Sequence, residues 1–455
     1  MIYALILPII KMAIRFYFRK INVIGNENYP KKGAAVLIVN HPSALLDPLV
    51  VAITAGRQLH YIAAAEYFGS KFSSWLFKKQ FNMIPVYRPD SGASEKVSNN
   101  HMFQHCFETL ANDGVIIIFP EGTSETEKKL RKLKTGVVRM VLGAEKYTNK
   151  HIPIIPVGIN YTNPHRFQSD VLLSVGAPMY IDHGIKAEDK EGVISQTLLV
   201  EEKLRNEVIH IEDEQLETTI QRVEQIFAKQ LQQDLGITND ELERKFTMTK
   251  DVIKAVAHFE STSPDSTTSI YKKMDRYYEI IKEIPMNGRL LNHIHSKNNF
   301  IEYGKIGLLF PVFLIGFLFN FIPFYFSGEF FKNKFLHRIK TTDKEHQIRP
   351  VFGGSIAFGI GTIFFVIWYL LLGVSTLLLY TWWASIIVLI VAYWSAQFSL
   401  YYLGVLRNIQ EKLKFNKIKL NHSAKINELL LLRAEIIIEL KSFADNFLKL
   451  SKKQF

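Results

Sequence analysis

Two long apolar segments near the carboxyl end most constrain how this chain can fold. Residues 353–380 and 383–406 contain no Asp, Glu, Lys or Arg. As helices, both are long enough to cross about 30 Å of membrane hydrocarbon. Tyr380, Trp382 and Trp383 mark the turn between them, and such aromatic side chains are enriched at membrane–water interfaces. The sequence therefore predicts a transmembrane hairpin with helices at 353–380 and 383–406.

A third apolar segment, 306–326, carries Pro311, Asn320 and Pro323, and proline interrupts a straight helix. The loop after this segment and the carboxyl-terminal tail are basic, which favours the cytoplasmic side for both. If the amino-terminal part of the chain is also cytoplasmic, the segment must leave the membrane on the side where it enters. Within a membrane region at 301–406 we expect it to be re-entrant or interfacial. The choice between two and three spans stays open.

Between Gly33 and Pro178, short apolar runs alternate with helical patterns. The expected strands are 34–39, 61–65, 83–87, 115–119, 152–159 and 171–175. The expected helices are 44–55, 70–79, 94–111 and 135–147. Continuously apolar strands that alternate with helices indicate a mostly parallel sheet flanked by helices on both faces. We predict an α/β domain at 23–182.

Three further regions are expected to be helical. Residues 183–300 are charged and helix-prone, with a polar linker or loop at 259–269. The basic tail, 407–455, has the periodicity of a surface helix or of one that forms oligomers. At the amino end, 1–22 reads as an apolar helix with a stripe of cations four residues apart, which favours a helix in the interface of an anionic membrane. A core helix with exposed cations is the alternative for 1–22.

Composition narrows the class of partner. The formal net charge is +12, while 48% of the residues are hydrophobic. This combination suits an anionic membrane or a phosphorylated substrate. No basic helix or zinc-finger spacing favours nucleic acid. The only cysteine, Cys106, lies in a helical pattern and reads as a small buried side chain rather than a nucleophile.

A strand followed by polar residues is the first candidate for chemistry. The apolar run 34–39 ends in Asn40, His41 and Pro42, and Asp47 follows six residues after the histidine. A histidine at the edge of a sheet is accessible to a substrate, and a carboxylate that accepts a hydrogen bond from its ring prepares it as a general base. The alternative is a strand end with a surface aspartate at the start of a helix.

The run 115–119 ends in a second polar turn, Phe119-Pro120-Glu121-Gly122-Thr123-Ser124. It offers a carboxylate, a close backbone approach and a hydroxyl. In open α/β sheets, ligands bind outside the carboxyl ends of the strands. Two such turns in one sheet favour a ligand site over plain strand-to-loop turns.

Four blocks in this order resemble the glycerophospholipid acyltransferase family, which includes lysophosphatidic acid and glycerol-3-phosphate acyltransferases. The blocks are Asn40-His41 with Asp47, Ile84-Pro85-Val86-Tyr87-Arg88, Phe119-Pro120-Glu121-Gly122-Thr123, and Ile154-Ile155-Pro156-Val157-Gly158. The resemblance covers about residues 20–180. Gly158-Ile159-Asn160-Tyr161 and Pro164-His165-Arg166-Phe167 are similar to a subgroup that acts on glycerol 3-phosphate or dihydroxyacetone phosphate. In two places the chain departs from the usual family pattern: five residues rather than four separate His41 from Asp47, and Ser124 stands where an arginine often follows Glu-Gly-Thr.

The resemblance implies a transfer of an acyl chain from a thioester to a glycerol-phosphate hydroxyl in phospholipid biosynthesis. His41 and Asp47 would be catalytic, as base and orienting carboxylate. Substrate binding would fall to Asn40, Arg88, Glu121, Gly122, Thr123 and Lys134. Of these, Arg88 would hold the phosphate, donors around Gly122 and Thr123 would stabilise the oxyanion, and Lys128, Lys129, Arg131 and Lys134 are candidates for a second cation.

Apart from acyl-CoA or acyl carrier protein as co-substrate, no cofactor and no metal are expected. Membrane lipids and a glycerol-phosphate acceptor are the expected partners, and the catalytic domain is expected on the cytoplasmic side of the membrane. The alternatives are a catalytically weak lipid-binding membrane protein on the same fold and an acyltransferase for another lysolipid. A thioesterase is disfavoured by the basic acceptor site. The acceptor, the acyl chain length and the choice of donor stay open.

Overall fold

The structure is a computed structural model. It describes residues 2–87, 99–182, 184–212, 214–238, 241–286, 288–291, 293, 300–340 and 348–451. The chain divides into two compact units. The first consists of Met1–His210 and Phe330–Ile360, and the second of Ile211–Glu329 and Gly361–Phe455. Arg88 lies outside the described residues, as does part of the expected helix 94–111.

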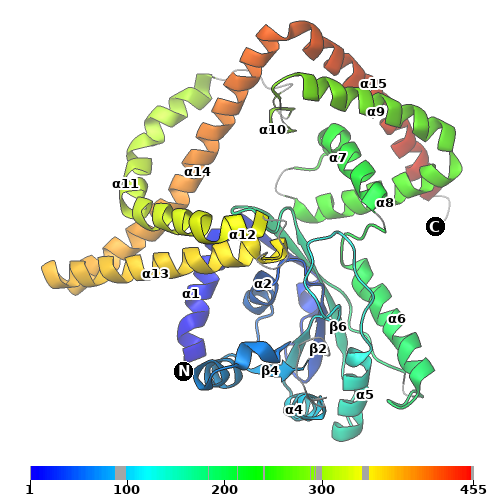
Figure 1. Cartoon of the computed structure of the whole chain (residues 1–455), viewed down its shortest axis with the longest axis vertical. Helices are drawn as coiled ribbons and strands as arrows, with labels where there is room; N and C mark the ends of the chain where they lie inside the picture. Colours follow the sequence, from blue (N-terminus) through cyan, green and yellow to red (C-terminus); the bar gives the residue numbers. More distant parts are fainter. Residues whose placement is uncertain are drawn as a thin grey trace. The chain divides into compact units, whose positions relative to one another are not determined.

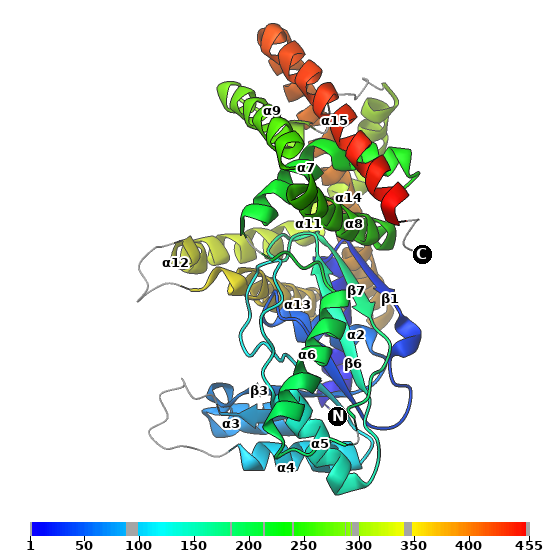
Figure 2. The same cartoon turned by 90° about the vertical axis from the view of Figure 1, so that its right-hand side faces the viewer.

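The first unit is built on one seven-stranded sheet in the order β1-β7-β6-β2-β5-β3-β4. Strands β2, β4 and β6 of this sheet are labelled in Figure 1. The strands are β1 Lys20–Ile24, β2 Ala35–Val39, β3 Leu59–Ala64, β4 Met83–Val86, β5 Val115–Ile118, β6 Ile154–Tyr161 and β7 Asp170–Val175. All neighbouring pairs are parallel except β6 and β7. The predicted mostly parallel sheet is therefore confirmed. The sequence prediction missed β1, which pairs with β7 at one edge (Figure 2).

Helices cover both faces of this sheet, so β2 is buried along its whole length. Leu37 and Val39 face a core shared with α1 and α2, whereas Val36 and Ile38 face a core shared with α4, α5 and α6. A strand covered on both sides reads as a continuous apolar run, which is why its type was visible in the sequence. The helices of this unit are α1 Ile2–Tyr17, α2 Leu46–Thr54, α3 Lys71–Trp75, α4 Asn100–Ala111, α5 Gly136–Thr148, α6 Lys190–Asn206 and the short α12 His337–Lys340.

Two helices outside the predicted domain 23–182 pack on its sheet. The last turn of α1 is buried in the sheet core through Ile14 and Tyr17, and β1 begins at Lys20, inside the predicted segment 1–22. At the other end, α6 packs on α5 and β6, and its Val193 and Val200 are buried in the core. Both helices belong to the α/β unit because each needs the sheet to cover its apolar side. Contact of the outer side of α1 with a membrane interface stays a prediction.

In the second unit, helices α7 Glu214–Asp234, α8 Leu242–Thr262, α9 Pro264–Glu283 and α15 Ser423–Ser451 pack around a common core, with α10 Gly288–Leu291 beside it. The predicted linker at 259–269 is wrong. Only Ser263 separates α8 from α9, and Pro264 begins the next helix, where its missing N–H costs no hydrogen bond. The tail is helical as predicted. On α15, Leu429 and Ile436 are buried in this core.

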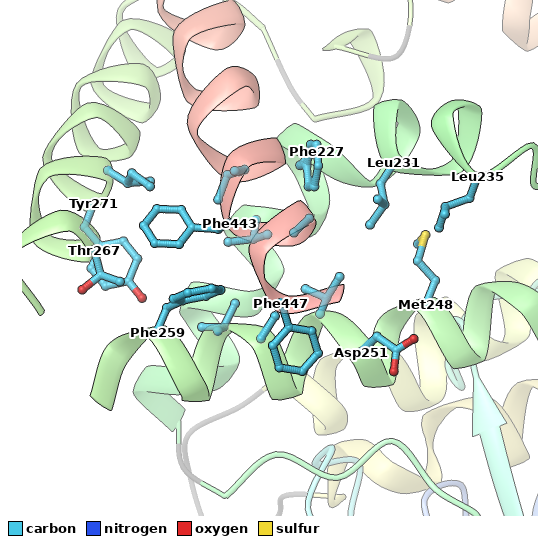
Figure 3. Close-up of a pocket in the computed structure, with 17 residues that line it drawn as sticks. Phe227, Leu231, Leu235, Met248, Asp251, Phe259, Thr267, Tyr271, Phe443 and Phe447 are labelled. Carbon is cyan, nitrogen blue, oxygen red and sulfur yellow. The ribbon is translucent and has the colours of Figure 1, made fainter. Parts of the chain in front are cut away.

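The four packed helices leave a largely apolar cavity of about 180 Å³, shown in Figure 3. Phe227, Phe259, Phe443 and Phe447 contribute aromatic side chains to its wall, and Asp251 contributes a carboxylate. All the residues that line it belong to the second unit, so His41 and Asp47 take no part in this cavity.

Among the described residues, three helices are long and apolar enough to cross a membrane by length and composition: α11 Phe300–Phe331, α13 Gly353–Leu379 and α14 Trp382–Asn421. The interruption expected at Pro311 and Pro323 is wrong, because α11 continues through both and bends instead (Figure 1). The side-chain amide of Asn320 forms hydrogen bonds to two other helices. It donates to Ala392 O over 3.0 Å and accepts from the Tyr369 hydroxyl over 2.8 Å. Whether α11 spans the membrane or is re-entrant stays a prediction.

Candidate active site

The two polar turns meet at one edge of the sheet because β2 and β5 are parallel neighbours, with Ile38 opposite Ile118. His41 follows the first strand, and the turn 119–124 follows the second. The backbone N–H of Glu125 donates to His41 O over 3.1 Å, which joins the two turns directly. The two polar turns therefore lie together, as the sequence predicted.

His41 and Asp47 form a hydrogen-bonded pair, with 2.7 Å between Nδ1 and Oδ2. Asp47 lies in the first turn of α2 and is fully buried, so the surface-aspartate alternative is wrong. Its carboxylate also accepts the Ser43 N–H over 2.8 Å and the Tyr161 hydroxyl over 2.9 Å. Burial raises the pKa of Asp47, whereas these three hydrogen bonds favour its ionised form.

This geometry suits His41 to act as a general base. A hydrogen bond to the carboxylate assigns a proton to Nδ1, which leaves the lone pair on Nε2. Phe119 stacks on the imidazole with ring centroids 4.1 Å apart, and it thereby holds the plane of the ring. The side chain of His41 remains 20% exposed beside a fully buried Asp47, so the ring is the accessible member of the pair.

Glu121 holds backbone in place. One carboxylate oxygen accepts the His41 N–H over 3.0 Å, and the other accepts the Arg131 N–H over 3.1 Å. Burial raises the pKa of Glu121, and the two N–H donors act against this shift. Both oxygens are therefore engaged within the protein, and the acceptor contact implied by the family resemblance stays a prediction.

Of the candidate cations, Lys134 lies against the turn 119–124. A Cβ added to Gly122, whose φ is +78°, would lie 2.5 Å from the Lys134 Nζ, so the ammonium lies against this glycine. Arg131 instead pairs with Glu125 and Glu127 and donates to the Thr123 hydroxyl over 3.2 Å. Lys134 thus supplies a positive charge next to the Glu-Gly-Thr turn, whereas the guanidinium of Arg131 is used in ion pairs.

Gly122 and Asn40 use backbone or side-chain polar groups in hydrogen bonds within the protein. The Gly122 N–H donates to Phe119 O over 3.1 Å, so it is not directed at a substrate oxyanion. Both polar groups of Asn40 bind the backbone of Ile159, at 3.0 Å to the carbonyl and 2.7 Å from the N–H. Asn40 therefore ties the end of β2 to β6, and a direct contact with substrate stays a prediction.

Sequence reasoning missed several residues of this site. Tyr161 lies in the subgroup signature and Phe119 in the second polar turn, but neither pattern indicates a contact with His41 or Asp47. Ser355, at the start of α13, lies outside every motif, although its hydroxyl donates to Ser43 O over 2.9 Å. No sequence spacing connects position 355 with position 43, so this contact had no signal in the sequence. Cys106 is buried as predicted, and burial raises its pKa to about 12, which keeps it a thiol.

Part of this chain is similar to known acyltransferases. Residues 20–160 match the family model described as Acyltransferase. Glycerol-3-phosphate O-acyltransferase 1 of Saccharomyces cerevisiae is 24% identical over 218 residues, which cover 46% of this chain and 26% of that protein. Glycerol-3-phosphate O-acyltransferase 2 of the same yeast is 34% identical over 90 residues, which cover 20% of this chain and 12% of that protein. The chloroplastic 1-acyl-sn-glycerol-3-phosphate acyltransferase LPAT1 of Arabidopsis thaliana is 25% identical over 119 residues, which cover 26% of this chain and 32% of that protein.

Among solved structures, the 1-acyl-sn-glycerophosphate acyltransferase of Thermotoga maritima is 21% identical, with a TM-score of 0.33, and the match covers 45% of this chain and 77% of that one. The chain spans about a quarter or less of the length of the two yeast relatives. The resemblance drawn from the motifs is confirmed: residues 20–160 form an acyltransferase-family domain.

Proposed function

We propose that this chain, through the acyltransferase-family domain at residues 20–160, is a membrane-bound glycerophospholipid O-acyltransferase. It moves an acyl chain from an acyl thioester, either acyl-CoA or acyl carrier protein, to a hydroxyl of glycerol 3-phosphate or 1-acylglycerol 3-phosphate. The observation that carries this proposal is the 2.7 Å pair of His41 and Asp47 at the sheet edge. The Lys134 ammonium lies against Gly122 in the neighbouring turn. The domain faces the cytoplasm, where it serves phospholipid biosynthesis.

The reaction follows from this arrangement. Nε2 of His41 takes the proton of the acceptor hydroxyl while the hydroxyl oxygen attacks the thioester carbonyl. Asp47 stabilises the imidazolium that forms. When the tetrahedral intermediate collapses, the C–S bond breaks and the imidazolium returns the proton to the departing thiolate. The products are an ester and a free thiol. The acyl chain goes directly to the acceptor, with no covalent enzyme intermediate and no resident cofactor.

Charge selects the acceptor. Lys134 lies beside Gly122, and Arg88 follows β4 by two residues in the sequence. A guanidinium and an ammonium together suit a phosphate dianion, with Arg88 as the bidentate partner. A neutral acceptor such as a monoacylglycerol lacks this interaction. With water as the acceptor the protein would be a thioesterase, and the two cations would have no phosphate to bind.

The test is a direct assay. The purified full chain in lipid nanodiscs receives acyl-CoA together with glycerol 3-phosphate, 1-acylglycerol 3-phosphate, or another lysolipid, and mass spectrometry identifies the product. We expect a new ester with a glycerol-phosphate acceptor. His41→Ala should lower kcat by about 10²–10⁴-fold, because water must then accept the proton.

Asp47→Asn should also lower turnover. Acylation only of another lysolipid would identify that acceptor in place of glycerol phosphate. Lipid binding without any turnover, with His41→Ala unchanged, would instead favour a lipid-binding protein on this fold.

A further inference from the structure

The loop between His41 and Asp47 contains a strained residue. Ala44 has φ of +47°, in the left-handed region that residues other than glycine seldom adopt. Such a conformation persists only where its surroundings hold it. The loop sets the separation between the imidazole and its carboxylate, so whatever holds Ala44 also determines the geometry of the pair.

Ser124 holds the first half of this loop. Its hydroxyl donates to His41 O over 2.8 Å and accepts the Ala44 N–H over 2.9 Å, so both capacities of one buried side chain are used on the strained segment. An arginine at position 124 has donors only, and it would leave the Ala44 N–H without this acceptor. Serine at position 124 therefore supplies both the donor and the acceptor that this loop uses.

Ser355 holds the second half in the same way. Its buried hydroxyl donates to Ser43 O over 2.9 Å and accepts the Leu46 N–H over 3.3 Å. This serine lies in the first turn of the apolar helix α13, more than 300 residues along the chain from the loop. The segment before it is tied to the same turn, because Arg349 donates to Ser124 O over 2.5 Å and pairs with Glu125.

We propose that Ser124 and Ser355 are positioning residues for the His41–Asp47 pair, so that the start of a membrane helix completes the active site. The inference rests on the acyl transfer proposed above. Neither serine touches a reacting atom. Together they hold both halves of the loop that keeps Asp47 against the imidazole, and a shift of about 1 Å in such a pair can cost about 10²-fold in rate.

The test compares Ser355→Ala and Ser124→Ala with Ser375→Ala, a matched change at an exposed serine of the same helix. Ser355→Ala and Ser124→Ala should each lower kcat by about tenfold or more, while KM for the acyl donor and for the acceptor stays within about twofold of the wild-type value. The double variant Ser124→Ala/Ser355→Ala should lose less than the product of the two single effects, because both act on one loop. In a His41→Ala background, Ser355→Ala should change the residual rate by less than about twofold.

A second measurement does not depend on turnover. Hydrogen–deuterium exchange of the loop peptide 42–47 should accelerate in Ser355→Ala and Ser124→Ala and should match the wild type in Ser375→Ala. Equal kcat and equal exchange for Ser355→Ala and Ser375→Ala would overturn the inference. So would an equal fractional loss in the His41→Ala background, which is the mark of a general folding defect. A wild-type chain that acylates none of the acceptors would refute the proposed function alone, because loop exchange still reports on the two serines.

Discussion

The hydroxyl of Tyr161 donates to Asp47 Oδ1 over 2.9 Å, while the other oxygen of the same carboxylate accepts from His41. Tyr161 ends β6 and is stacked on Phe18, so its hydroxyl reaches the aspartate from a strand that the His41 motif does not include. The carboxylate that is paired with His41 is therefore itself held by a tyrosine.

Tyr161→Phe should lower kcat about tenfold and leave KM nearly unchanged. The variant keeps the ring and its packing but removes one donor to a buried carboxylate, an interaction worth about 1.5–3 kcal/mol. Steady-state kinetics measure the effect. Tyr29→Phe is the control, because it removes a tyrosine hydroxyl that contacts Thr54 instead. Equal turnover in both variants would show that Tyr161 does not orient Asp47.

Glu121→Gln should lower both turnover and the unfolding temperature. The glutamine has one carbonyl oxygen for the two backbone N–H groups of His41 and Arg131 that the carboxylate now accepts, and a buried donor left unpaired costs about 1–3 kcal/mol. Kinetics and thermal unfolding are measured together, with the exposed Glu127→Gln as control. A raised KM for the acceptor, with kcat and stability intact, would instead assign Glu121 to acceptor binding.

Lys134→Ala and Arg88→Ala should each raise KM for the phosphorylated acceptor by about 10–100-fold, because each removes a charge-assisted contact worth about 1.5–3 kcal/mol. KM for the acyl donor should change little. Arg88→Lys should recover only part of the loss, since an ammonium cannot bind two phosphate oxygens as a guanidinium does. Lys132→Ala, at an exposed neighbouring position, is the control. Equal effects on both substrates would make these cations structural.

Chain connectivity constrains the membrane topology. Ser355 and Arg349 contact the loop and turn of the candidate active site, so we expect α13 to begin on the side of the membrane that holds the α/β domain. Within the described part of the chain, α11 is the one candidate span between His210 and Arg349. If α11 crossed the membrane once, Arg349 would lie on the side opposite to the α/β domain. We therefore expect α11 to lie in the membrane interface or to enter the bilayer without crossing it.

The same reasoning pairs α13 with α14. Helix α15 packs against α9, where Lys273 pairs with Glu435 over 3.3 Å, so an even number of crossings is expected between them. In a Cys106→Ser background, single cysteines within 90–95 and within 340–345 should react with an impermeant maleimide from one side of sealed vesicles. A cysteine at Thr381 should react from the other side. Labelling after detergent addition is the control, and reaction of the first two sites from opposite sides would show that α11 crosses.

Much of the fold could be predicted from sequence because its signals are local. A strand covered on both faces must be apolar at every position, so β2 and β5 could be recognised from their residues alone. The short edge strand β1 is half-buried throughout and follows α1 closely, and it has no such signature. The segment 259–269 was wrongly predicted for a different reason. Ser, Thr and Pro are common at a helix start as well as in a loop, so its composition fits both.

What the sequence alone determined about the site is where His41, Asp47 and the turn 119–124 lie, since each comes after a buried strand. Only the tertiary structure decided how they are held. Tyr161 reaches Asp47 across 114 residues, and Ser355 reaches Ser43 across 312. A hydroxyl finds its partner through space, and local periodicity carries no information about which distant backbone group that partner will be. Positions 161 and 355 therefore acquire their place in the site only when the sheet is assembled and the first turn of α13 packs against its edge.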